Sequence, residues 1–433
     1  MKKLIALLLI LTMVCATFAG CAKTTEETTE SAAEPTAAAE TATETTTEAA
    51  AETAAEPTKL TLILRGGTYG DVVKAALPDF EAANNCTCEV LELSFDDLHT
   101  KIALDAVNAE GAYDLCMVDG SWMAEFTANN VLTNLSEMGY TLDDDIIPAT
   151  TTICKVGDDV YLAPFFGNVT VLLYNKQLIA DAGYEAADID TFADVMDIAQ
   201  KTYDAGKIGF IIRGGSGDNI VSDFIPHLLA YGGWVVDDNN QPTVTTDEFK
   251  AAFTNYIDLY KLGATMDKDD IVAAIDNGTA ALAIGWPGWY VPTADSNASY
   301  TVIPTKLTDT DTAKNTSMYG VWTIGICNNS QNKELTLKLL EYLMSADVQL
   351  ASIDNGGVPC RYSCLQNADV LAQYPQLETV CGALETGVYR PVIEQWAEFT
   401  NILGTEMDSV IQGTKTMDDG LADAQASLEA LMS

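Results

Sequence analysis

The chain has 433 residues, of which 48% are hydrophobic and 20% charged, so it is not a collagen, a coiled coil or a mostly disordered protein, and its length predicts two or three domains. The formal net charge of −41 makes unassisted binding to nucleic acid or to anionic lipid unfavourable. Only two histidines, His99 and His227, are present, which leaves little for imidazole metal sites or histidine acid–base catalysis.

Residues 1–20 are predicted to be a lipoprotein signal peptide. Lys2 and Lys3 precede an apolar run that ends at Phe18 and is shorter than the roughly 20 residues a membrane span needs. The run closes in Phe-Ala-Gly-Cys at Cys21. This resembles the lipobox of bacterial lipoproteins, in which the cysteine receives a lipid, although Phe stands where Leu is usual. The alternative is an ordinary signal with a chance cysteine at the cleavage point.

Residues 21–58 follow as the lipidated Cys21 and a disordered tether. Residues 22–58 hold twelve Thr, twelve Ala and nine Glu, with nothing large and apolar to bury. Repulsion among the glutamates should extend the tether. We therefore expect an exported protein, lipid-anchored to the outer face of the bacterial cytoplasmic membrane, whose folded part reaches away from the lipid.

The folded part opens as an alternation of strands and helices. Residues 59–64 read as a buried strand, which is followed by a glycine turn and a helical pattern through Phe80. Next come a second strand over 89–93, a helix over 97–108 and a third strand over 115–118. Asp119 and Trp122 follow this third strand. Open α/β sheets bind ligands outside the carboxyl ends of their strands, where these turns lie.

Further elements continue the pattern toward the C-terminus. Residues 209–212 read as a strand, and residues 249–262 read as a helix with an apolar stripe. The last helix carries apolar residues at helical spacing from Leu421 to Leu431, after a cap formed by Thr416 and Asp419. No internal repeat points to a solenoid or a propeller.

Enzyme signatures are mostly absent from the sequence, and a metal site at Cys86 and Cys88 or at Cys360 and Cys364 is a weaker alternative to buried thiols or disulfides. There is no phosphate-binding P-loop and no nucleophile elbow, and the stretch that begins at Asp267 lacks the glycine and glutamate of a calcium loop. A glycoside hydrolase stays open, because a pair of carboxylates could flank a cleft anywhere in so acidic a chain. Eight cysteines remain beyond Cys21, either as buried thiols or with one or two disulfides.

Tryptophans give a more specific indication. Five of the six follow a strand-like segment or a glycine turn: Trp122, Trp234, Trp286, Trp289 and Trp322. Indole faces suit the apolar faces of sugar rings, while neighbouring carboxylates and amides bind the hydroxyls. We assign Trp234 and Trp396 to core packing, and the others favour a carbohydrate cleft.

Several blocks together resemble one family. Residues 113–122, running on to Leu135, and residues 161–176, running on to Gly183, are similar to two blocks of the family 1 extracellular solute-binding proteins. Residues 280–286, 320–326 and 357–361 resemble later motifs of that family, in the same order. These proteins serve ABC importers, mostly of carbohydrates, and the maltose and multiple-sugar binding proteins are the type that the chain resembles.

The resemblance implies a two-lobed α/β fold of the periplasmic-binding-protein type II, with two open α/β domains joined by crossing strands. Residues 59–167 plus 320–355 would form lobe 1, and residues 168–319 plus 356–433 would form lobe 2. The crossings are expected near 166–169, near 317–320 and near 350–358. A solute would bind between the lobes.

By the same resemblance, the ligand-binding residues are Thr68, Asp119, Trp122, Phe165, Phe166, Trp286, Trp289, Trp322 and Arg361. Asp119 would accept hydrogen bonds from hydroxyl groups, the indoles would stack on rings, and Arg361 would donate from its planar guanidinium. An ion pair of Arg361, either between the lobes or on the surface, is the alternative.

The implied function is that of a substrate-binding lipoprotein of an ABC transporter. It would capture a sugar or oligosaccharide by hinge closure and deliver it to membrane permease subunits, as a monomer without cofactor, metal or catalytic residue. A peptide, a polyamine or another metabolite is the first alternative ligand, and the acidic net charge favours cations. A glycoside hydrolase and a surface adhesion module are weaker alternatives.

Overall fold

The computed structural model describes residues 56–215, 217–292 and 295–433. The expected signal peptide, Cys21 and nearly all of the expected tether lie outside these residues. Within the described ranges, no helix combines the length and the apolar character that a membrane crossing requires.

The first sheet has five strands in the order β2-β1-β3-β12-β6. They are β1 (Thr58–Arg65), β2 (Cys86–Leu93), β3 (Leu115–Asp119), β6 (Ala163–Phe166) and β12 (Trp322–Ile326). β1 pairs in parallel with β2 and β3, while β12 is antiparallel to both of its neighbours. The whole of β3 is buried, as expected for a central strand with both faces covered.

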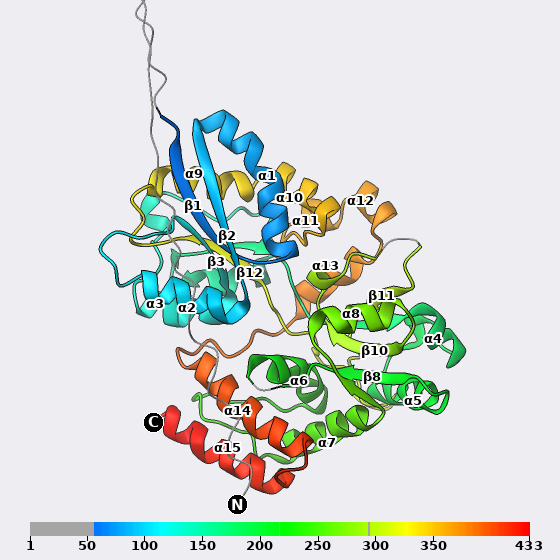
Figure 1. Ribbon diagram of the computed structural model, residues 1–433. Helices are drawn as coiled ribbons and strands as arrows, with labels where there is room; N and C mark the ends of the chain where they lie inside the picture. The colour runs from blue at the N-terminus through cyan, green and yellow to red at the C-terminus, as the bar shows by residue number, and fades with distance from the viewer. Residues whose placement is uncertain (1–55, 216, 293–294) are drawn as a thin grey trace, which may run out of the picture. The chain divides into compact units, whose positions relative to one another are not determined.

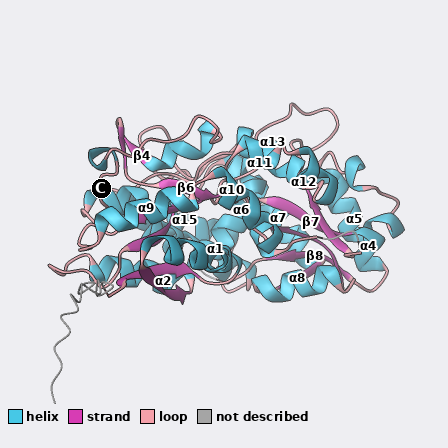
Figure 2. Ribbon diagram, turned by 90° about the horizontal axis from the view of Figure 1, so that it is seen from above, coloured by secondary structure: helices cyan, strands magenta, loops and turns pink. Residues whose placement is uncertain are grey.

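Helices cover both faces of this sheet (Figures 1 and 2). They include α1 (Thr68–Asn84), α2 (Phe95–Asp105), α3 (Met123–Ala128), α9 (Lys333–Leu343) and α10 (Ala346–Ser352). α2 begins where the side chain of Ser94 accepts a hydrogen bond from the backbone of Asp97, which satisfies one free N–H of the first turn. α1 begins after Gly67, whose φ of 80° lies in the region that favours glycine.

The second sheet has the order β11-β7-β10-β8-β9. Its strands are β7 (Val171–Asn175), β8 (Ile208–Ile212), β9 (Gly263–Thr265), β10 (Ala280–Gly285) and β11 (Ala298–Thr301). The helices that belong to it are α4 (Lys176–Asp181), α5 (Phe192–Asp204), α6 (Asp218–Tyr231), α7 (Asp247–Lys261) and α8 (Lys268–Asp276). Because a β-carbon at Gly263 would meet the carbonyl oxygen of Phe210 at 1.6 Å, β9 can approach β8 only with glycine there.

Three chain segments join the two sheets. Residues 167–170 lead from β6 to β7, residues 317–321 lead into β12, and the two hydrogen-bond to each other through Gly320 N to Asn168 O at 2.9 Å. The third segment runs beside them, since Val388 N donates to Ser317 O at 2.9 Å. The first two crossings lie where they were expected, whereas the third lies near 388 and not at 350–358.

The segment around 350–358 stays with the first sheet instead. It includes η6 (Ile353–Asn355), and Val358 O accepts a hydrogen bond from Gly167 N. The elements that follow are α11 (Tyr362–Leu365), α12 (Ala368–Gln373) and α13 (Leu377–Thr386), and α11 contacts α10 while α13 contacts η3 (Pro148–Cys154). The assignment of residues 356–433 to lobe 2 is not tested by these contacts and stays a prediction.

The chain ends in two helices, α14 (Trp396–Ile411) and α15 (Met417–Leu431), which contact each other. α14 also packs on α6, so α14 and α15 belong with the second sheet (Figure 1). Thr416 caps α15 by accepting a hydrogen bond from Asp419 N at 3.1 Å, which confirms the predicted cap. The remaining elements are β4 (Lys155–Val156), β5 (Asp159–Val160), η1 (Gly120–Trp122), η2 (Ser136–Met138), η4 (Ala186–Asp188) and η5 (Pro287–Trp289).

The strands and helices predicted from the sequence are confirmed, with ends shifted by a few residues. The eight described cysteines are all free thiols, and seven are buried. This is the first of the two expected alternatives, and it suits thiols that pack as small apolar groups. Trp396 lies in the core beside the second sheet, and the partly buried Trp234 packs against the same cluster, as predicted.

Candidate ligand-binding cleft

A cleft lies where the two sheets face each other. The first sheet and its helices contribute Arg65, Tyr69, Phe95, Asp119 and Trp322. The second sheet and its helices contribute Arg213, Asp218, Asn219, Lys268, Trp286 and Trp289. The crossing segments contribute Asn168, Gly320 and Arg390.

Strand ends place most of these side chains. Arg65 and Asp119 end β1 and β3, and Arg213 and Trp286 directly follow β8 and β10. Trp322 begins the antiparallel β12, and it lies opposite Asp119 in the sheet. The cleft therefore occupies the carboxyl ends of the parallel strands, as the order of elements predicted.

The aromatic side chains come from both sides of the cleft. On the first side, the Tyr69 ring lies 5.4 Å from the Trp322 ring, and the Phe95 ring lies 6.0 Å from it at a near-perpendicular angle. On the second side, the guanidinium of Arg213 lies 5.2 Å over the ring of Trp289. A planar or ring-shaped ligand between them would have apolar faces on two sides.

Four of the nine predicted ligand residues line this cleft: Asp119, Trp286, Trp289 and Trp322. Trp122 lies behind them, with its ring 5.6 Å from Trp322, and is buried. Phe166 packs against Tyr69 at 4.7 Å, and neither Phe165 nor Phe166 is among the residues that line the cleft.

Thr68 and Arg361 also lie away from the lining. Thr68 begins α1, and its methyl group faces Gly356. The Arg361 guanidinium is paired with Asp143 at 2.8 Å and with Asp145 at 3.1 Å, and it donates twice to the carbonyl of Met344. These partners use its donors, so the ion-pair alternative describes its surroundings better than a ligand contact does.

Arg390, which the sequence did not single out, joins the two sides. Its guanidinium lies 2.5 Å from Asp119 Oδ1 on β3 and 3.3 Å from Asp218 Oδ1 at the start of α6. Arg390 and Asp119 are almost fully buried. Asp119 also accepts hydrogen bonds from the backbone and the hydroxyl of Ser121 through the same oxygen, Oδ1.

Three further cations line the cleft: Arg65, Arg213 and Lys268. With Arg390 they outnumber the two acidic side chains in the lining, so the cleft does not follow the acidic charge of the chain. None of the three was predicted to bind the ligand. Arg65 and Arg213 could have been found as the polar residues that end predicted strands.

Asp223 lies beneath Arg213 and carries no ligand role. Its Oδ2 accepts from the Tyr256 hydroxyl at 2.6 Å and from the Arg213 backbone at 2.9 Å. Burial raises the pKa of Asp223 to about 6, although the hydroxyl, the backbone N–H and the nearby Arg213 charge oppose the shift. Its ionisation therefore costs stability at neutral pH.

We expect Asp223→Asn to stabilise the protein at pH 7 but not at pH 4. In the unfolded chain Asp ionises near pH 3.9, so raising the pH through the folded value of about 6 lowers stability by up to about 3 kcal/mol. Asn keeps the acceptor oxygen without the charge. Urea unfolding at pH 4, 5, 6 and 7 should show a difference between variant and wild type that grows with pH. A difference that does not change with pH would contradict the assignment.

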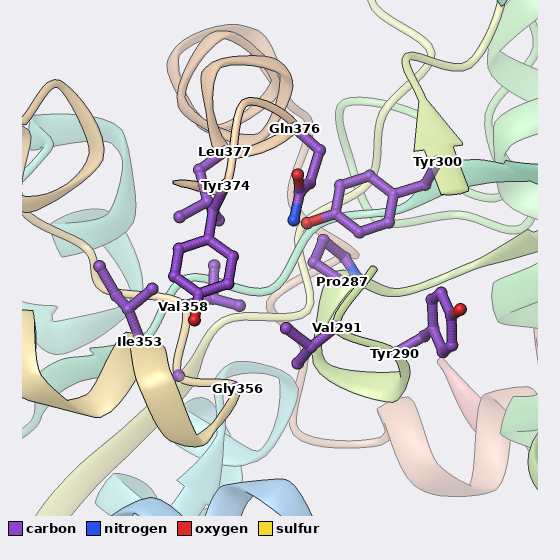
Figure 3. Close-up of a pocket in the computed structure, with 11 residues that line it drawn as sticks. Pro287, Tyr290, Val291, Tyr300, Ile353, Gly356, Val358, Tyr374, Gln376 and Leu377 are labelled. Carbon is purple, nitrogen blue, oxygen red and sulfur yellow. The ribbon is translucent and has the colours of Figure 1, made fainter. Parts of the chain in front are cut away.

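A second, smaller pocket of about 250 Å³ is shown in Figure 3. Tyr374 and Gln376 reach into it from one side, while Pro287, Val291 and Tyr300 form the other. Its lining holds no charged side chain. It therefore offers few groups to bind a polyhydroxylated or charged solute. Among the described residues, no group of three or more His, Cys, Asp or Glu side chains is arranged to hold a metal ion.

Comparisons with known proteins agree with this geometry. Residues 66–350 match the family described as bacterial extracellular solute-binding protein. A solute-binding protein of Agrobacterium radiobacter in complex with ribitol superposes with a TM-score of 0.78 at 24% identity, over 86% of this chain and 98% of that one. The maltose-bound MalE3 of T. maritima superposes with a TM-score of 0.76 at 23% identity, over 86% and 100% of the two chains. The predicted two-lobed α/β fold is thereby confirmed.

Two curated relatives differ in the ligand that their names give. A protein of Sinorhizobium fredii named "Probable amino-acid ABC transporter periplasmic-binding protein" is 21% identical over 86% of this chain and 89% of its own length. A mannitol-binding protein of Pseudomonas aeruginosa is 26% identical, over 38% of each chain.

Proposed function

We propose, from the premise that this chain belongs to the bacterial extracellular solute-binding protein family, that it captures a sugar or a related polyol for an ABC importer. The observation that carries the proposal is the cleft that faces indoles from both sheets, Trp322 on one side and Trp286 and Trp289 on the other. Structurally similar proteins bind ribitol, maltose and mannitol, which supports a polyhydroxylated ligand.

Capture would work by closure of the two lobes on the ligand. A ligand that contacts both sides gains contacts only when the sides are together, and this difference in affinity shifts the population toward the closed state. Crossing segments that hydrogen-bond to one another, as Gly320 does to Asn168, provide a place for the bend. The closed form would then be recognised by membrane permease subunits.

The place of action would be outside the cytoplasmic membrane. We propose that the protein is exported and carries a lipid at Cys21, and that residues 21–58 tether the folded part to the membrane. It would act as a monomer. The apolar run before Cys21 and the Thr/Ala/Glu composition after it support this arrangement.

The arrangement of the acidic residues in the cleft fits a protein that binds its ligand without catalysis. A glycoside hydrolase needs one carboxyl group that holds a proton for the leaving group. Asp119 and Asp218, the acidic residues of the lining, are both ion-paired with Arg390, so neither stands as an unpaired carboxyl group beside the ligand. We therefore propose no enzymatic activity.

A panel of ligands tests the function. A ligand that binds only the folded protein raises its melting temperature. We expect at least one saccharide or polyol to do so, among hexoses, hexuronic acids, hexose phosphates, maltose, ribitol and mannitol, and to make the protein more compact in X-ray scattering. Amino acids, peptides and polyamines form the comparison arm, since the name of one relative gives an amino acid. Binding confined to that arm would contradict the proposal.

Trp289→Ala should weaken binding of the best saccharide in the panel about tenfold, because one stacking face is lost. Trp289 is only partly buried, so the loss of stability should be small. Trp234→Ala is the matched control: it removes a partly buried indole that packs against the core and lies outside the cleft lining. Calorimetry on both variants should show weaker binding for Trp289→Ala alone, and equal affinities would remove Trp289 from the site.

A further inference from the structure

We propose, resting on the proposed function, that the ligand is an anionic sugar: a saccharide that carries a carboxylate or a phosphate. The acidic group would lie among Arg65, Arg213 and Lys268, and the ring would lie against the indoles of the cleft. The cleft brings these three positively charged side chains together, and they have few negatively charged partners.

The three cations come from three separate elements. Arg65 ends β1 of the first sheet, Arg213 follows β8 of the second, and Lys268 is the first residue of α8. Lys268 reaches across to the other lobe, since a β-carbon built on Gly67 would lie 3.8 Å from its Nζ. The cations therefore meet in the gap between the lobes, where a ligand held from both sides would sit.

Their own partners do not neutralise them. Among the described residues, no carboxylate forms an ion pair with Arg65 or Arg213. One guanidinium nitrogen of Arg65 donates to the carbonyl of Leu93 at 3.0 Å, and the buried Nε of Arg213 has no hydrogen-bond partner. A buried donor without an acceptor is costly, and a bound carboxylate or phosphate would supply the acceptor.

Lys268 has only a weak partner. Its Nζ lies 3.8 Å from Asp269, whose side chain is 94% exposed, so water screens that contact. The two acidic residues of the lining, Asp119 and Asp218, are themselves ion-paired with Arg390. Asp218 and the buried Asp223 offset part of the Arg213 charge.

Repulsion among the cations supports this description. The pKa of Lys268 is lowered mainly by burial; Asp269 opposes this shift, and the charges of Arg65 and Arg213 act in the same direction as burial. Burial also lowers the pKa of Arg213, with a further contribution from Arg65 in the same direction. Like charges held together in a cleft are relieved by an anion between them.

Two helices add to the positive potential. α1 and α6 both begin at the cleft, where Tyr69, Asp218 and Asn219 line it. Each helix follows a glycine that offers no side-chain cap, Gly67 and Gly217. The partial positive charge of a helix N-terminus, with its free N–H groups, favours a bound anion.

Calorimetry on charge-matched pairs tests the inference. The pairs are galacturonate with galactose, glucuronate with glucose, and glucose 6-phosphate with glucose, together with inorganic phosphate and acetate alone. We expect the acidic member of at least one pair to bind at least about tenfold more tightly than its neutral partner, with an affinity that falls as salt rises. The carboxylate and phosphate arms separate the two sources of charge.

Charge-removing variants locate the effect. Lys268→Gln and Arg65→Gln should each weaken the acidic sugar about tenfold or more, because each removes a charge-assisted contact. The affinity of the neutral partner should fall by less than that of the acidic sugar, so the ratio between the two affinities should shrink. Lys155→Gln, which alters an exposed lysine of β4 outside the cleft lining, is the control and should change neither.

The outcomes separate this inference from the proposed function. Neutral sugars that bind as tightly as their acidic partners, with no effect of Lys268→Gln, would overturn the anionic ligand while leaving sugar capture in place. Binding of inorganic phosphate or acetate as tight as that of the acidic sugars, with no binding of neutral sugars, would overturn both. A preference for acidic sugars that Lys268→Gln and Arg65→Gln leave intact would also overturn the inference.

Discussion

Replacing Arg390 with methionine is expected to lower the free energy of unfolding by about 3–5 kcal/mol, because removing one partner leaves buried charge uncompensated. Arg390 is the buried partner of both Asp119 and Asp218, and Asp119 itself is only 3% exposed. Methionine keeps much of the volume of the side chain, so the loss would come from charge and hydrogen bonding and not from a cavity.

Urea unfolding of purified wild type and variant measures the effect. The matched control is Lys250→Met, which breaks the exposed pair with Asp418 at 2.7 Å and should cost less than about 1 kcal/mol. If Arg390→Met were no more costly than Lys250→Met, the buried bridge would contribute nothing to stability. The same variant should also bind saccharide more weakly, because it frees the carboxylate of Asp119 from its fixed position.

Gly320→Ala is expected to reduce saccharide affinity by about a hundredfold, the scale of losing a central aromatic contact. A β-carbon at Gly320 would lie 2.3 Å from Cζ3 and 2.7 Å from Cη2 of Trp286, so the indole must leave its position in the cleft. Backbone strain is not the cause, because Gly320 is not among the glycines with positive φ. The methyl group acts only through the ring that it displaces.

Gly382→Ala is the control for this variant. A β-carbon there meets no atom within 4 Å, and the residue lies in α13, so alanine should raise stability by about 0.5–1 kcal/mol and leave binding unchanged. Calorimetry with the saccharide that gives the largest thermal shift compares the two variants. Unchanged affinity for Gly320→Ala would show that Trp286 is not part of the binding surface.

The sequence predicted the fold and part of the site for one physical reason. Parallel strands buried on both faces, such as β1 and β3, produce uninterrupted apolar runs that end abruptly in polar residues. Asp119 and Trp286 stand at such ends, whereas Trp322 follows a glycine turn and begins β12. Trp122 follows the same strand as Asp119 yet turns into the core behind Trp322, and no pattern along the chain distinguishes these two directions.

Long-range pairing explains what could not be predicted. Arg390 lies 271 positions from Asp119 and 172 from Asp218, so nothing near it along the chain shows that it pairs with these residues. The family resemblance placed the third crossing near 350–358, but the chain first forms α11, α12 and α13 and crosses afterwards near Val388. Arg361 was expected in the site, while Asp143 and Asp145, more than 200 positions earlier, engage it elsewhere.

The chain crosses three times between the two sheets, and this affects how the protein withstands proteolysis outside the cell. Segments 167–170, 317–321 and 387–389 lie side by side and are hydrogen-bonded in a row. A protease that cut any one of them would leave the halves attached through the other two. Such a nicked molecule would still open and shut about the same axis, so we expect loss of transport to lag behind the first backbone cleavage.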